Sequence, residues 1–340
     1  MLRSIPFDHE GKKGEAERDM TRSRLTASIV IATRNRKEEL RNTIASAVSQ
    51  TIGAEVLIID DGSTDGTSEM VCSEFPQVRF IRCEEARGYI ARRNEGARLA
   101  AGDVVISIDD DAVFSTPHII EETLRDFNLE RVGAVAIPYI DVSTDTRLRQ
   151  MAPDSESVYI SNSYIGTAHA VRLDVFLRLG GYREHFVHQG EEEDYCIRML
   201  NAGYVVRLGT ADPIHHFESP KRDFSRRDFY GARNAVLFAW QNVPFPPLLV
   251  HLPATSIRCL LFTLRPNRFK TRLAGLIDGY IAILRRCWER RPVSVSVYLL
   301  HRKVKKAGRY CTLQEMERRL PILMRENRVA ETETPVPLER

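Results

Sequence analysis

The chain has 340 residues, of which 43% are apolar and 28% charged, fractions typical of a globular protein and not of a disordered or fibrous one. The formal net charge of +3 is unevenly distributed, because residues 258–309 contain fourteen lysines and arginines against two acids. The six cysteines form no C-x-x-C pair and no zinc-finger spacing, which favours reduced thiols over a disulfide framework or structural zinc. Residues 1–24 lack the apolar core of a signal peptide, and we expect a flexible segment there.

Short apolar runs alternate with helical patterns through the first half of the chain. Each run ends in polar or turn-forming residues, and a segment with apolar residues at helical spacing follows. Four such repeats predict an α/β fold with a mostly parallel, Rossmann-like, doubly wound sheet and right-handed crossovers. The predicted strands are residues 28–32, 56–59, 78–81, 104–108, 132–137 and 204–208, and the main predicted helices are residues 90–101, 117–127, 171–179 and 190–203, with two earlier helices after residues 36 and 66.

The central feature is an apolar strand, residues 104–108, that ends in Asp109, Asp110 and Asp111. In open α/β sheets ligands bind at the carboxyl ends of the strands. Three adjacent carboxylates repel one another unless a cation shares them, and Mg²⁺ or Mn²⁺ holding a phosphorylated ligand would do so. The alternative is a solvated acidic turn that caps the next helix.

Five motifs in series resemble the family 2 glycosyltransferases of the GT-A fold. The resemblance covers roughly residues 25–238, and motifs that occur in order are more specific than any one of them. They are SIVIATRNRKEEL at 28–40, VLIIDDGSTDGT at 56–67, the segment 87–94, ISIDDD at 106–111 and GEEEDYCIR at 190–198.

The resemblance implies a metal-dependent, inverting transferase of a hexose or deoxyhexose. The donor would be a UDP-, dTDP- or GDP-linked sugar, and the acceptor a hydroxyl of a glycan or lipid-linked glycan. In this family the end of the first strand and the DDGS loop hold the nucleotide. The residues implied in donor binding are Thr33, Asn35, Asp61, Arg87, Arg93, Asp109 and Asp110. An EF-hand interpretation of DDGSTDG fails, because the twelfth position from Asp61 is Cys72 and not Glu.

Asp109-x-Asp111 resembles the metal-binding acid motif of the family. The resemblance implies Asp111 as the main ligand of Mn²⁺ or Mg²⁺, with Asp109 closer to the ribose and diphosphate. His215 or His216 follows the last predicted strand, where a family histidine contacts metal or diphosphate. A neutral imidazole suits Mn²⁺, although a structural role is the alternative for either histidine.

The general base in this family is an acid near the start of a late helix. Aligning Asp194 to Arg198 with the family pattern places the base on Glu192, and Glu191, Glu193 and Asp194 remain rivals. On one helical turn these side chains point in different directions, so only one or two can face a cleft. The resemblance implies that residues 163–167 and 180–182 line the acceptor side of the site. Tyr164 or Tyr182 would stack on a sugar there, and the alternative for either ring is a place in the core.

Residues 223–325 are expected to form a helical, basic and amphipathic region, and residues 326–340 a tail, after a catalytic domain of residues 25–222. Residues 234–257 carry no formal charge, but four prolines there argue against one membrane-spanning helix. Apolar residues at helical spacing between residues 273 and 288 indicate a basic amphipathic helix. This helix would lie on an anionic membrane surface, or it would pack against the catalytic domain. In the first case the protein would be cytoplasmic and peripheral on the inner face of the cell membrane.

Two other functions remain open from the sequence. A strand followed by Asp109-x-Asp111 also fits haloacid-dehalogenase-like phosphatases, in which the first Asp is phosphorylated, although three βα units precede it here. The second alternative is a non-catalytic module of the same fold that binds sugar nucleotide or membrane. The sequence indicates no nucleic-acid partner.

Overall fold

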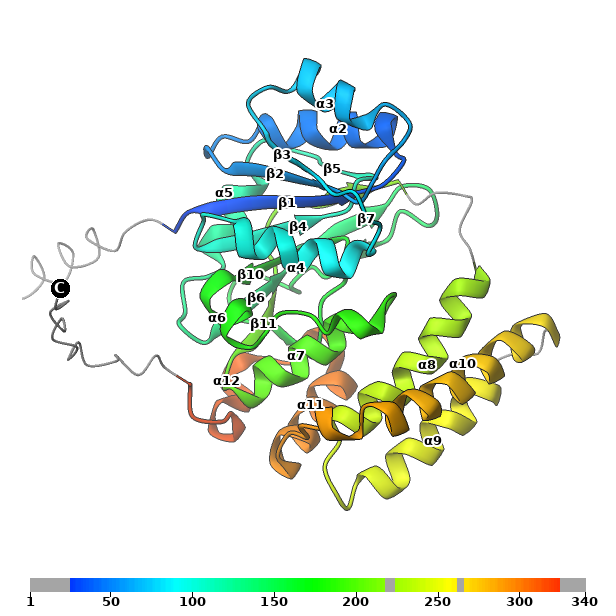
Figure 1. Ribbon diagram of the computed structural model, residues 1–340. Helices are drawn as coiled ribbons and strands as arrows, with labels where there is room; N and C mark the ends of the chain where they lie inside the picture. The colour runs from blue at the N-terminus through cyan, green and yellow to red at the C-terminus, as the bar shows by residue number, and fades with distance from the viewer. Residues whose placement is uncertain (1–24, 218–223, 262–265, 325–340) are drawn as a thin grey trace, which may run out of the picture.

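The computed structural model describes residues 25–217, 224–261 and 266–324 (Figure 1). An eight-stranded sheet with helices on both faces forms the larger part, and a group of C-terminal helices lies beside it. The main sheet comprises β1 (Ala27–Thr33), β2 (Glu55–Asp60), β3 (Arg79–Arg82), β4 (Val104–Ile108), β6 (Val132–Ala136), β9 (Ile160–Ser161), β10 (Ala168–Arg172) and β11 (Val205–Leu208). The helices of this part are α2 (Lys37–Val48), α3 (Thr67–Glu74), α4 (Tyr89–Leu99), α5 (Ile119–Arg125), α6 (Leu173–Arg178) and α7 (Glu191–Asn201).

The strand order is β3-β2-β1-β4-β10-β6-β11-β9. The first four strands are parallel, as predicted, but β10 runs antiparallel between β4 and β6. The predicted helix at residues 171–179 was therefore wrong at its start, because Val171 and Arg172 belong to β10 and α6 begins at Leu173. The fold remains the expected α/β fold, with one antiparallel strand in the middle of the sheet.

A smaller second sheet lies at the carboxyl edge of the first. Its order is β5-β12-β7-β8, with β5 at Ala112–Phe114, β7 at Tyr139–Asp141, β8 at Leu148–Arg149 and β12 at Ile214–His216. β5 starts directly after the acids that follow β4, and β12 pairs with it antiparallel. The second sheet thus brings the residues around position 216 next to these acids.

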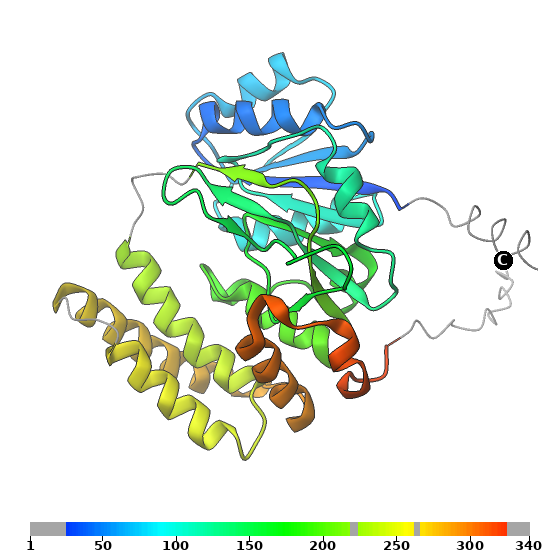
Figure 2. The same cartoon turned by 180° about the vertical axis from the view of Figure 1, so that it is seen from behind.

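The C-terminal helices form two groups. α8 (Phe224–Asn242), α9 (Leu248–Leu261) and α10 (Pro266–Arg285) pack on one another, whereas α11 (Val295–Ala307) and α12 (Leu313–Met316) return to the sheet (Figure 1; Figure 2 shows the same groups from behind). A β-bridge between Tyr159 and Thr312 fixes the returning segment. Within the described ranges no helix combines the length and hydropathy that crossing a bilayer requires. The predicted boundary at residues 222 and 223 and the predicted segments 1–24 and 326–340 lie outside the described residues.

Candidate active site

Polar residues from three neighbouring strands meet at the carboxyl edge of the main sheet. The hydroxyl of Thr33, at the end of β1, donates a hydrogen bond to Asp110 Oδ2 over 2.8 Å. The backbone N–H of Asp61, directly after β2, donates to the carbonyl of Thr33 over 2.9 Å. Since β1 lies between β2 and β4, the acids that follow the two outer strands converge on it. This is the edge at which α/β sheets bind ligands.

Arg36 neutralises two of the three acids after β4. Its Nη1 lies 2.5 Å from Asp111 Oδ2 and 3.2 Å from Asp110 Oδ1. Burial raises the pKa of Asp110 to about 7. At Asp111 burial acts in the same direction, but hydrogen bonds from His216 and Arg36 outweigh it and hold the pKa of Asp111 below its usual value. Arg36 therefore occupies the position of a positive charge between these two acids.

Asp109, Asp111 and His216 form a group that could hold a metal ion. One ligand atom from each lies within 4.8 Å of the others, and His216 Nε2 is 3.3 Å from Asp111 Oδ1. His216 reaches the acids because it lies opposite Ala112 in the pairing of β12 with β5. His215 precedes it on the strand, so its side chain leaves the other face. Of the two predicted histidines, the structure brings His216 to the acids.

The carboxylate of Asp61, predicted to bind a base, is held by the chain itself. Oδ1 accepts hydrogen bonds from the backbone N–H of Arg87 at 2.8 Å and from Arg92 Nε at 2.6 Å. Oδ2 accepts one from the N–H of Gly88 at 2.9 Å. Asp61 thus fixes the turn before α4, and acceptor capacity for a ligand remains at Oδ2.

Asn35 and Arg87 contact other parts of the protein as well. Asn35 Oδ1 accepts a hydrogen bond from the N–H of Thr64 at 2.7 Å, and its own N–H donates to Ser63 Oγ at 2.9 Å. These bonds tie the loop after β1 to the loop after β2. Arg87 Nη2 lies 2.7 Å from Glu184, and 53% of the Arg87 side chain is exposed. Asn35 therefore shapes the loops of the site, and Arg87 lies at its rim.

Arg93 connects the acids after β4 with the start of α7. Its Nη2 lies 2.5 Å from Asp109 Oδ1 and donates to the carbonyl of Gly166 at 2.9 Å, while Nη1 is 3.6 Å from Glu191 Oε1. The guanidinium also stacks over the ring of Tyr89, 4.8 Å from its centroid. Only 7% of the Arg93 side chain is exposed, so it forms a buried bridge between the two acidic groups.

The acids at the start of α7 have different environments. Glu191 is fully buried, and neither of its carboxylate oxygens has a hydrogen-bond partner among the described residues. Burial, together with the neighbouring Glu192, raises the pKa of Glu191 well above its usual value. Glu192 is half-buried beside Gly166, and burial raises its pKa too. Glu193 points outward and pairs with Lys305. Glu192 is thus the acid that combines a raised pKa with partial access.

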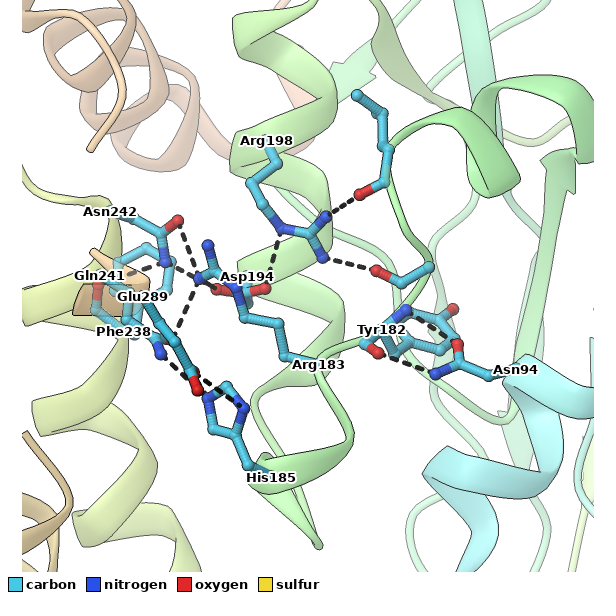
Figure 3. Close-up of polar contacts among 12 residues, drawn as sticks. Asn94, Tyr182, Arg183, His185, Asp194, Arg198, Phe238, Gln241, Asn242 and Glu289 are labelled. Atoms are coloured by element: carbon cyan, nitrogen blue, oxygen red, sulfur yellow. Dashed lines mark hydrogen bonds and ion pairs between the residues drawn. The ribbon is translucent and has the colours of Figure 1, made fainter. Parts of the chain in front are cut away.

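Asp194 lies in a separate polar cluster between α7 and α8 (Figure 3). Its Oδ1 accepts hydrogen bonds from Arg183 at 2.5 Å and Asn242 Nδ2 at 2.7 Å, and its Oδ2 accepts one from Arg198 Nε at 3.1 Å. The same cluster continues through Gln241 to His185. Because Asp194 is fully buried with both oxygens held, the structure gives it a structural role in place of the predicted catalytic one.

Tyr164 and Tyr182 belong to the core beneath the predicted acceptor loop. Each is 3% exposed, and their hydroxyls are 2.7 Å apart. The hydroxyl of Tyr182 also lies 2.8 Å from His169 Nε2, and the Tyr164 ring stacks on the His169 ring. The prediction that either ring stacks on a sugar was wrong, and the core alternative is correct.

Two features of the site escaped the sequence analysis. Arg36 lies where the sequence predicts the entry into a helix. The available signal for its role is that this basic residue follows one strand while another strand ends in three acids. The second sheet was missed because strands of two or three residues produce no periodic pattern. Without it, His215 and His216 could not be distinguished.

Comparisons with known proteins agree with this geometry. Residues 28–180 match the family model described as Glycosyl transferase family 2. The O-antigen chain rhamnosyltransferase WbaN of Salmonella anatum is 25% identical over 236 residues, which cover 56% of this chain and 73% of the relative. The glucosyl-dolichyl phosphate glucuronosyltransferase of Haloferax volcanii is 30% identical over 203 residues, which cover 52% of this chain and 63% of the relative.

Solved structures share the fold. The mannosyltransferase PcManGT from Pyrobaculum calidifontis, in complex with GDP-Man and Mn²⁺, has a TM-score of 0.54 at 18% identity, covering 87% of this chain and 90% of its own. S. aureus TarS 1-349, in complex with UDP-GlcNAc, has a TM-score of 0.59 at 14% identity, covering 86% and 92%. Fold and relatives together define a glycosyltransferase of the GT-A class, not a phosphatase. Within that class, the segment 28–180 matches glycosyltransferase family 2.

Proposed function

We propose that this chain is a metal-dependent, inverting glycosyltransferase that moves a sugar from a UDP-, dTDP- or GDP-linked donor to an acceptor hydroxyl. One observation carries the proposal. Asp109 belongs to the group with Asp111 and His216 that could hold a metal ion, and it also forms an ion pair with Nη2 of Arg93. Nη1 of Arg93 faces Glu191 at the start of α7. A site for the leaving diphosphate and a site for the base are therefore adjacent.

The side chains of the metal group fit a divalent cation. Two carboxylate oxygens and an imidazole nitrogen suit Mn²⁺, and Mg²⁺ binds through the carboxylates. Asp141 Oδ2 lies 3.6 Å from His216 Nδ1, the ring nitrogen away from Asp111; this is too long for a hydrogen bond, but a small shift would bring the carboxylate into the place from which such groups orient a ligating histidine. When bound, the ion would neutralise the charge that develops on the departing nucleoside diphosphate.

Glu192 is proposed as the base. The acceptor hydroxyl loses its proton to the Glu192 carboxylate while its oxygen attacks the anomeric carbon from the face opposite the diphosphate. The bond between that carbon and the diphosphate oxygen breaks in the same step, which inverts the configuration. A carboxylate whose pKa is raised by burial is a better base near neutral pH than an ordinary glutamate. Arg93 acts as a positioning residue, because it holds Asp109 and contacts Glu191 at once.

The nucleotide is proposed to lie over the ends of β1 and β2. The residues predicted to line it surround this edge: Thr33, Asn35, Asp61, Arg87 and Asp110. Arg87 lies at the rim of the site, where its guanidinium group can turn from Glu184 to a phosphate of the donor. The GDP-Man and UDP-GlcNAc complexes of the two solved structures support a nucleoside diphosphate sugar as donor class.

The acceptor is proposed to be a lipid-linked glycan used in cell-envelope polysaccharide synthesis. The names of two relatives support this choice, since one concerns the O-antigen chain and the other a sugar on dolichyl phosphate. Such an acceptor places the reaction at the cytoplasmic face of a membrane. In this proposal residues 25–222 carry out catalysis, and residues 223–325 are the region that meets the membrane.

The test is nucleotide release from donor sugars with and without acceptor, in Mn²⁺ and in EDTA. Asp111→Asn is expected to lower the rate at least about 1,000-fold, since it removes a charged ligand at the site of developing charge. The exposed acid variant Asp145→Asn serves as matched control and keeps the rate. NMR of the product should show inversion. Full activity in EDTA and in Asp111→Asn, or an acyl-phosphate on Asp109, would overturn the proposal.

A further inference from the structure

α10 exposes a continuous apolar stripe. Large apolar side chains recur along it at intervals of four and three residues, which places them on one face of the helix. The stripe consists of Phe269, Leu273, Ile277, Ile281 and Leu284, with Trp288 just beyond the helix, and these side chains are 38% to 77% exposed. The opposite face packs on α8 so closely that a Cβ on Gly275 or Gly279 would collide with α8 backbone carbonyls. The stripe is therefore the outer face of a firmly held helix.

α9 extends the apolar surface. Leu249, Val250, Ile257 and Leu261 are 56% to 74% exposed. A hydrogen bond of 2.8 Å between the hydroxyls of Ser256 and Tyr280 joins α9 to α10. Of the 25 large apolar side chains exposed on the described residues, thirteen lie between residues 224 and 288. A concentration of this kind marks an interaction site, because monomeric proteins seldom expose extended apolar patches.

The charges around this surface have one sign. Exposed basic residues flank it on α9, at Arg258, and on α10, at Lys270 and Arg285. The two acids between residues 258 and 309 are both neutralised: Asp278 lies 2.6 Å from Arg233 and Glu289 lies 2.7 Å from Arg286. The apolar stripe thus has a positive border, which complements an anionic surface.

We propose that the outer face of α9 and α10 docks this protein on an anionic lipid membrane, with α10 lying in the plane of the headgroups. Helices with a large apolar face and a basic border bind membranes in this orientation. A second copy of the chain fits less well, because a two-fold interface would bring two positive borders together. The proposal rests on the part of the proposed function that assigns residues 223–325 to the membrane, but its test is separate from sugar transfer, since docking requires neither donor nor acceptor.

Docking on this face would also orient the active site. Asn234 of α8 donates hydrogen bonds from Nδ2 to the carbonyls of Phe186 and Gln189 at 2.8 and 2.7 Å. These residues lead directly into the first turn of α7, which carries Glu192. Because α10 is packed on α8 and α8 holds this segment, a membrane bound to α10 has a fixed position relative to the proposed base.

The experiment is flotation of the full chain with vesicles of phosphatidylcholine alone or of equal parts phosphatidylglycerol and phosphatidylcholine. We expect binding to the anionic vesicles that weakens with salt, and little binding to the neutral ones. Leu284→Ser should lower the affinity about tenfold, because it removes a side chain that is 77% exposed before docking and buried afterwards. Lys270→Glu should lower it at least about fivefold.

Controls lie on the sheet domain. Leu177→Ser on α6 and Arg125→Glu on α5 make the same kinds of change at exposed side chains, 43% and 69% exposed, and should leave vesicle binding unchanged. A blue shift of tryptophan fluorescence on binding, absent in Trp288→Phe, would place the end of α10 in the lipid.

Equal binding of Leu284→Ser and the parent chain would overturn the proposal. A dimer in lipid-free solution that Leu284→Ser dissociates would overturn it in favour of a second copy. Nucleotide release measured without lipid tests the proposed function separately.

Discussion

The strand-end site and the α9–α10 surface use charged and apolar side chains in opposite ways. At the sheet edge, charged groups such as Arg93, Asp111 and Glu191 are buried. On the α9–α10 surface, apolar side chains such as Leu284 are exposed and the charges form a border. Burying charge and exposing apolar surface both cost free energy unless a partner compensates. The two departures from ordinary packing agree with the two proposals, which assign a charged ligand to one site and an apolar surface to the other.

Two clusters of the molecule each hold a buried acid, Asp194 at α7 and Asp228 on α8, but the arginines around these acids differ in exposure, which gives the largest expected effect. Asp194 is fully buried, and its partners Arg183 and Arg198 are 16% and 14% exposed. Asp228 pairs with Arg268 and Arg272, which are 37% and 22% exposed, so water reaches that cluster more easily.

Removing Asp194 leaves buried charges unpaired, so Asp194→Ala should lower the free energy of unfolding by about 3 to 5 kcal/mol. Asp228→Ala should cost less, about 1.5 to 3 kcal/mol, because water can solvate the partly exposed arginines that the substitution leaves unpaired. Urea denaturation of both variants measures the difference. Equal losses would show that the two clusters do not differ in burial energetics.

The parallel half of the sheet was predictable because its strands are apolar runs that end in polar residues. The predicted residues 28–32 and 104–108 lie within β1 and β4. β10 was not predictable in the same way, since Ala168, His169 and Ala170 include no β-branched residue, and burial against β4 and β6 decides their conformation. Long-range pairing cannot be derived from local pattern.

The same limit applies to the site. The motifs identified the acids after β4 and at the start of α7, but their individual environments depend on partners far away in sequence. Asp194 differs from Glu192 because Arg183 and Asn242 reach the one and not the other. His216 differs from His215 because of the pairing of β12 with β5. The motifs therefore predict the chemical type of the residues, and tertiary packing determines which of them lie in the site.

The next prediction tests whether chemistry is confined to the sheet edge. Glu192→Gln should lower kcat about 100-fold or more, because the amide cannot accept the acceptor proton. Donor binding and vesicle binding should stay as in the parent chain. Glu193→Gln is the matched control, since Glu193 pairs with Lys305 at the surface, and it should keep at least half of kcat. Loss of kcat in both variants alike would move the base away from Glu192.

The pH dependence follows from the direction of the Glu192 pKa shift. Burial raises this pKa in the folded protein, and a base works only when deprotonated. The value of kcat should therefore fall as pH decreases through the raised pKa, about tenfold per pH unit, beginning above the ordinary glutamate range. Donor binding measured over the same pH range separates this effect from a loss of donor affinity. A kcat that stays constant down to the ordinary glutamate range would contradict the assignment.

The smallest expected effect comes from a single methyl group at Gly166. A Cβ at this position would lie 2.5 Å from Glu192 Oε1 and 2.8 Å from Arg93 Nη1, so both side chain ends must move. Since the half-buried Glu192 can turn aside more easily than the enclosed Arg93, Gly166→Ala should still fold and lower kcat about tenfold by displacing the base from its productive position. Gly53→Ala, where the added Cβ meets no atom within 4 Å, is the control and should leave kcat unchanged. If Gly166→Ala instead lowered the melting temperature while kcat stayed constant, Gly166 would serve the core and not the base, and the partial access of Glu192 would need another explanation.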